Sequence, residues 1–78
     1  MSMYTVHQGK HYRAIFALNW AEQIASNDLI AQRLRDAGFA EVNVKGQGHT
    51  REATAIWPRK DTTAQIPPQI ISIQEIEV

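Results

Sequence analysis

The 78-residue sequence contains no cysteine, and this absence excludes three possibilities at once. Without thiols there are no disulfide cross-links, no thiolate zinc site and no cysteine nucleophile. The longest uninterrupted apolar run, Ala14 to Leu18, is far shorter than the roughly 20 residues that span a bilayer. The first residues also lack the basic and apolar regions of a signal peptide. We therefore expect no contact with a membrane, and a location in the cytoplasm or within an assembled particle.

A net charge is also missing. Eight Lys and Arg residues balance eight Asp and Glu residues, so the formal net charge is zero. Neutrality argues against nucleic acid or an anionic membrane as a partner, because both are bound largely by long-range electrostatic attraction. The length supports one domain over residues 1–78, with an ordinary globular composition of 44% hydrophobic residues. Since so small a core gives little stability and disulfides are excluded, we expect a protein partner or a homo-oligomer to supplement it.

Alternating polar and apolar residues predict a strand over residues 11–18. Its apolar face holds four side chains: Tyr12, Ala14, Phe16 and Leu18. Residues 4–6 predict an edge strand or an extended tail. Gly9 lies between the two segments and can supply the positive φ of a tight hairpin turn.

From Asn19 onward, the spacing of the apolar residues changes to that of a helix. Asn19 and Glu22 stand in a pattern close to a capping box, which predicts a helical turn. Ser26 is a second N-cap candidate, and Gly38 suits the left-handed residue that ends many helices. We expect one main helix at about 27–37. The sequence leaves open whether the two helical segments are continuous.

The second half of the chain predicts three further extended segments. Residues 41–45 and 51–57 alternate on either side of a glycine-rich reversal, which indicates a β-hairpin that ends at Pro58. A loop over residues 59–69 then leads into the last strand. The predicted fold is α+β, with one α-helix packed on a mostly antiparallel sheet of four to five strands in the order (β)-β-α-β-β-loop-β. The other face of the sheet would be open, or covered by a partner.

The last strand, residues 70–78, changes phase. Ile71 and Ile73 share one parity, whereas Ile76 and Val78 share the other. A β-bulge near Gln74, or a strand that leaves its sheet, would explain this pattern. A helix on one face cannot cover both parities. The alternatives are that the N-terminal arm and the 59–69 loop bury them, or that a partner does.

The three histidines form no recognisable metal-binding or catalytic pattern. His7 and His11 flank a predicted turn, and His49 lies in a glycine-rich loop with no carboxylate at a ligand spacing. No spacing in the chain joins a nucleophile, a base and an orienting group. We therefore expect no enzymatic activity, no metal and no cofactor.

One helix-to-strand junction has counterparts in a known family. Residues 34–39, Leu-Arg-Asp-Ala-Gly-Phe, are followed by Glu-Val-Asn-Val at 41–44 and Thr-Arg-Glu-Ala at 50–53. These segments resemble part of the SPOR family of glycan-binding domains. The resemblance implies a β-α-β-β-α-β fold that binds peptidoglycan glycan strands on its sheet. In this sequence, Pro67-Pro68 stands where the family has its second helix.

Two functional classes fit these patterns. The first is a non-enzymatic small subunit or adaptor of a larger assembly, such as a component of a phage particle or a secretion complex, associating through a sheet edge and the last strand. Its predicted interface residues are Trp57, Pro58, Ile71, Ile73, Ile76 and Val78. The alternative is a module that binds a glycan or single-stranded nucleic acid on the open sheet face. Its predicted ligand-binding residues are Tyr12, Phe16, Arg51, Trp57 and Arg59.

Overall fold

The computed structural model describes residues 3–78, which form one α-helix, one turn of 3₁₀ helix and six strands. The bounds are β1 Met3–Val6, β2 His11–Ala17, η1 Glu22–Ile24, α1 Asn27–Ala37, β3 Ala40–Gln47, β4 Thr50–Ile56, β5 Thr62–Gln65 and β6 Ile70–Ile76. The predicted α+β class, the single helix and the order of the main elements are confirmed.

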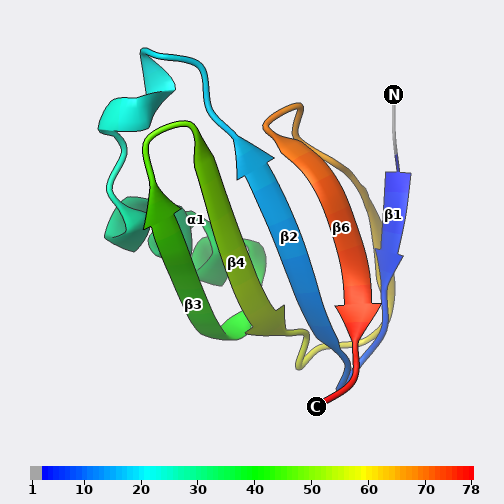
Figure 1. Ribbon diagram of the computed structural model, residues 1–78. Coiled ribbons are helices and arrows are strands. Elements are labelled where there is room, and N and C mark those ends of the chain that lie inside the picture. The colour runs from blue at the N-terminus through cyan, green and yellow to red at the C-terminus, as the bar shows by residue number, and fades with distance from the viewer. Residues whose placement is uncertain (1–2) are drawn as a thin grey trace.

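The strands form two antiparallel sheets. Four strands make the main sheet in the order β3-β4-β2-β6, and β1 pairs with β5 in a separate two-stranded ribbon. Because β4 lies between β2 and β3 and is antiparallel to both, the strands on either side of α1 run in the same direction (Figure 1).

One face of the main sheet is covered and the other is open. Helix α1 lies behind β3 and β4, and the β1–β5 ribbon lies beside and partly behind β6 (Figure 1). We call this covered side the inner face. Its core consists of Ala14, Phe16, Leu18, Ile30 and Ala53, with Leu34, Val44, Ile70 and Ile73 packed against them. No element within residues 3–78 covers the outer face.

Local signals set both ends of α1, as the sequence predicts. The Ser26 hydroxyl accepts a hydrogen bond from the backbone N–H of Leu29 at 3.1 Å, and Gly38 ends the helix in the left-handed region at φ 118°. Asn19 and Glu22 exchange side-chain-to-backbone bonds of 2.8 and 2.9 Å, which completes the predicted capping box. Ser26 is extended, so η1 and α1 are separate segments.

Two predictions about the N-terminal strand and the 59–69 loop are wrong. Residues 3–6 do form a strand, but it does not pair with β2 in a hairpin, because β4 and β6 occupy both edges of β2. Its partner is β5, which forms within the predicted loop. The N-terminal arm and this loop thus build one ribbon together.

The β-bulge lies earlier in the last strand than predicted. Ile15 pairs with Ser72 and Phe16 pairs with Ile70, so Ile71 is the extra residue and the strand is regular at Gln74. The bulge allows Ile70 and Ile73, three positions apart, to face the core together. Ile71 is thereby turned away from the core and is 65% exposed.

Candidate functional site: an edge strand and an adjoining apolar cleft

The predicted interface residues fall into three environments. Ile71 and Val78 are 65% and 93% exposed, and Pro58 is also exposed. Ile76 is half-buried on the outer face, opposite His11 of β2. Trp57 and Ile73 face inward instead, Trp57 within a buried cluster and Ile73 against the main core. The accessible part of the predicted interface is therefore Pro58, Ile71, Ile76 and Val78.

The two edges of the main sheet differ in how they are protected. At the β3 edge, Glu41 has a positive φ of 50° and the pairing with β4 is irregular between Ala40 and Asn43. Such irregularities discourage further strands from adding to an edge, and so does an outward Lys such as Lys45. At the β6 edge, the strand is regular from Ser72 onward and rich in isoleucine.

A cleft of about 490 Å³ adjoins β6 on the inner face, between α1 and the β1–β5 ribbon. Buried side chains form its floor: Val6, Phe16, Ile30 and Trp57. Its opening lies between exposed residues of two elements, Arg33 and Ala37 on α1, and Thr62, Ala64 and Gln65 on β5. The cleft thus combines an apolar interior with a polar rim, which is the usual composition of a ligand pocket.

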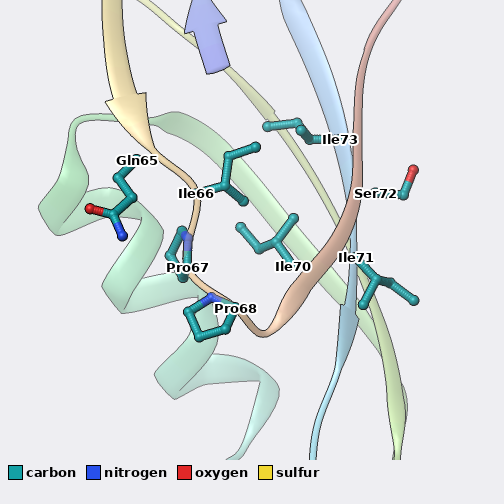
Figure 2. Close-up of a pocket in the computed structure, with 8 residues that line it drawn as sticks. All are labelled: Gln65, Ile66, Pro67, Pro68, Ile70, Ile71, Ser72 and Ile73. Carbon is teal, nitrogen blue, oxygen red and sulfur yellow. The ribbon is translucent and has the colours of Figure 1, made fainter. Parts of the chain in front are cut away.

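A second hollow, of about 540 Å³, lies beneath the connection from β5 to β6. Figure 2 shows Ile66, Ile70 and Ile73 pointing toward one another, while Ile71 points to the opposite side of the strand. These three isoleucines also line the cleft, so the two hollows share a wall. Within this connection Pro67 and Pro68 belong to a turn, in which the backbone N–H of Ile70 donates to the Pro67 carbonyl at 3.0 Å.

Arg51 is the one buried charged residue among those described, with 4% of its surface exposed. Its guanidinium donates to the carbonyls of Gln23, Ala25 and Gly48 and to the side-chain oxygen of Asn27, at 2.8–3.2 Å. These acceptors belong to the η1–α1 junction and to the β3–β4 turn. Arg51 is therefore a structural anchor that joins the helical segment to the sheet.

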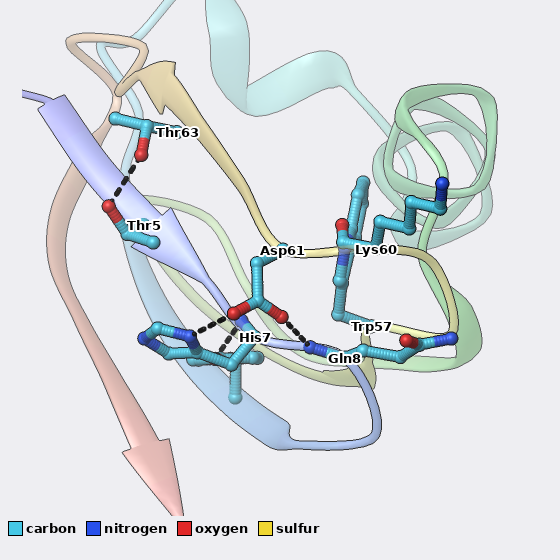
Figure 3. A network of polar contacts seen from close by, with 8 residues as sticks. Thr5, His7, Gln8, Trp57, Lys60, Asp61 and Thr63 are labelled. Atoms are coloured by element: carbon cyan, nitrogen blue, oxygen red, sulfur yellow. Dashed lines mark hydrogen bonds and ion pairs between the residues drawn. The ribbon is translucent and has the colours of Figure 1, made fainter.

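A different group of contacts, drawn in Figure 3, holds together the two strands of the ribbon and the loop that leads into β5. Asp61 accepts from the backbone N–H of Gln8 at 2.8 Å, and its other oxygen lies 2.9 Å from Nδ1 of His7. These two bonds hold the pKa of the Asp61 carboxyl below its ordinary value, and the bond from the Gln8 N–H makes the larger contribution. Trp57 Nε1 donates to the Lys60 carbonyl at 2.8 Å. The hydroxyls of Thr5 and Thr63 join β1 to β5 at 2.6 Å.

The residues predicted for a ligand on the open sheet face lie elsewhere. Tyr12, Phe16, Arg51 and Trp57 are all between 3% and 9% exposed, because the helix and the ribbon cover the face that they occupy. Only Arg59 of that set is exposed. The outer face instead presents Arg13, Thr54, Glu52, Lys45 and Ile15. The predicted aromatic platform is therefore absent from the open face of the described residues.

The histidines are dispersed. His7 bonds Asp61, His49 Nδ1 lies 2.9 Å from the Leu18 carbonyl oxygen, and His11 is on the outer face. Within the described part of the chain, no three His, Asp or Glu side chains gather as a metal ion would require. No helix of residues 3–78 is long and apolar enough to cross a membrane.

Comparison with known proteins gives no match: no protein family, curated protein or solved structure matches this chain. The segment containing Pro67-Pro68, where the resemblance to the SPOR family implies a second helix, follows β5 and forms no helix.

Sequence reasoning missed the cleft because its walls come from separate segments. Arg33 and Gln65 at the opening are 32 positions apart, and each looks like an ordinary surface residue in the sequence. The available signal was the surplus of isoleucine near the end of the chain. Three of these isoleucines, Ile66, Ile70 and Ile73, line the cleft.

Proposed function

We propose that this protein is a non-enzymatic small subunit or adaptor of a larger protein assembly, and that it joins its neighbour through the edge strand β6. The observation that carries this proposal is that one edge of β6 has no hydrogen-bonded strand. Within residues 3–78, β6 pairs with β2 on one side and with no strand on the other, while β1 pairs with β5 in a separate sheet.

The side chains of β6 support the same proposal. An edge strand without a partner on one side can pair there with a strand of another chain, because its unpaired N–H and C=O groups form a ready template. Ile71 and Val78 would lose exposed apolar surface in such a contact. With a formal net charge of zero, little long-range repulsion opposes the approach of a second copy, which is the simplest neighbour.

Sedimentation equilibrium tests this proposal through the exposed Ile71. The wild-type weight-average mass should rise above 8.8 kDa as the protein concentration increases. Ile71→Glu places a charge at the contact and should abolish that rise. Because Ile71 is 65% exposed, the variant should keep the wild-type circular dichroism spectrum.

Ile24→Glu is the matched control. Ile24 is also an exposed isoleucine, at 91%, but it belongs to η1 and not to β6. It should leave the association unchanged. A wild-type mass of 8.8 kDa at every concentration would contradict association between copies, and an equal loss in both variants would remove β6 as its site.

A further inference from the structure

The cleft between α1 and the β1–β5 ribbon carries an inference beyond assembly. We propose that it binds a single-chain amphiphile, with a linear aliphatic tail along the floor and an anionic head group at Arg33. Its volume of about 490 Å³ falls within the range of roughly 300–1,000 Å³ that is typical of small-molecule pockets.

The interior of the cleft specifies the tail. Its deepest side chains are aliphatic or aromatic, and those of Phe16 and Ile30 belong to the main core. The indole N–H of Trp57 is already bonded to the Lys60 carbonyl, so it offers no donor to a ligand. A polar tail would lose its bonds to water without replacement there, whereas an aliphatic tail would gain from leaving water.

The opening specifies the head group. Arg33 is the one charged side chain among the described residues that line the cleft, and it forms no ion pair within residues 3–78. Thr62 and Gln65, on the opposite side of the opening, can both donate hydrogen bonds. A guanidinium that shares an opening with further hydrogen-bond donors complements an anion, and a carboxylate fits its planar fork best.

Tryptophan fluorescence can follow binding directly. Trp20 is 85% exposed, so Trp20→Phe should fold normally and leaves Trp57, at the floor of the cleft, as the single tryptophan. In this background, dodecanoate below its micelle concentration should change the emission of Trp57 saturably. Affinity should rise by about fourfold for each added methylene from octanoate upward, and level off when the tail fills the cleft.

Variants of Arg33 test the head group. Arg33→Gln should weaken dodecanoate by roughly tenfold and leave the neutral analogue dodecanol unchanged. Arg35→Gln is the matched control, since Arg35 is an exposed arginine of the same helix that does not line the cleft. Dodecyl phosphate should also bind through Arg33, and its affinity relative to dodecanoate identifies the preferred anion.

A third variant tests the location of the tail. Ala64 is an exposed residue of β5 that lines the cleft, so Ala64→Phe should block it without disturbing the fold. Loss of dodecanoate binding in this variant, with an unchanged circular dichroism spectrum, supports the proposal. The proposal is overturned by any of three results: no saturable change up to the solubility limit, equal weakening by Arg33→Gln and Arg35→Gln, or unchanged binding in Ala64→Phe.

Discussion

The two elements that cover the inner face of the sheet are held by different kinds of polar contact. Helix α1 is joined to the sheet through Arg51, a buried cation with four hydrogen bonds to neutral oxygens. The two strands of the ribbon are joined to each other through Asp61, whose side chain is 59% exposed and bonds His7, which is 51% exposed. The cleft therefore lies between one wall held by shielded bonds and another held by bonds that water can replace.

The difference shows that buried and exposed charged contacts contribute unequally to the stability of a small chain. A buried charge is kept only where every donor has a partner, and removing the charge leaves several carbonyls without one. An exposed carboxylate can be lost at little cost, because water takes its place. We expect the helix side to determine whether the protein folds, and the ribbon side to respond to pH.

The largest effect should follow from Arg51→Met. Methionine retains much of the apolar stem but cannot donate, so the carbonyls of Gln23 and Ala25 lose their partner. We expect the free energy of unfolding to fall by about 3 kcal/mol, measured by urea denaturation. Arg13→Met, at an exposed position of β2, is the control and should change it by less than about 0.5 kcal/mol. Equal urea midpoints for Arg51→Met and Arg13→Met would show that Arg51 does not anchor the helical segment to the sheet.

A smaller effect is expected at Gly38, where α1 meets the tryptophan beside the ribbon. Its φ is 118°, and a Cβ atom there would lie 2.8 Å from Cη2 of Trp57. Gly38→Ala should therefore lower the free energy of unfolding by about 2 kcal/mol through backbone strain and the steric clash.

Gly9→Ala separates these two causes. Gly9 also has a positive φ, of 81°, but a Cβ there would meet no atom within 4 Å. It should cost about 1 kcal/mol, from the backbone alone. If urea denaturation shows that both substitutions lower the free energy of unfolding equally, the close packing of Trp57 on Gly38 adds nothing to the effect of Gly38→Ala.

The smallest effect concerns pH and the Asp61 contacts. The folded pKa of Asp61 is lowered from its ordinary 3.8, so its bonds stabilise the fold above pH 3.8 and that contribution is lost as the pH falls through the lower folded pKa. Asp61→Asn should melt below the wild type at pH 6, and this difference in melting temperature should shrink as the pH falls below 3.8 and the wild-type carboxylate takes up its proton. Asp36→Asn on α1 is the control. A gap that persists undiminished in acid would contradict this linkage.

The sequence predicted the features that depend on neighbouring residues, and missed those that depend on residues far apart in the chain. Ser26 and Gly38 specify the ends of α1 within a few residues of themselves, and the alternation around Phe16 identifies the buried face of β2. By contrast, β1 and β5 are only four residues each, β5 shows no alternation, and the two strands meet only in the folded chain. The anchoring role of Arg51 was missed for the same reason. Apart from Gly48, its hydrogen-bond acceptors are 24 to 28 residues away in the chain.

The last strand shows an intermediate case. The isoleucine pattern correctly indicated that β6 cannot bury all its apolar residues on one face. It did not locate the bulge: a slip at Gln74 would place Ile73 and Ile76 on one face, whereas the slip at Ile71 places Ile70 and Ile73 together and leaves Ile76 on the outer face. The pairing of Phe16 with Ile70 decides between them, and that pairing is a property of the neighbouring strand.

The ribbon also has a consequence for the order of folding. Thr5 and Thr63, which join its two strands, are 58 residues apart in the chain. Closing so long a loop costs entropy that four-residue strands cannot offset, unless the intervening sheet and helix have already brought the ends together. The ribbon should thus form last and open first, and native-state hydrogen exchange should find the amides of β1 and β5 exchanging well before those of β2 and β4.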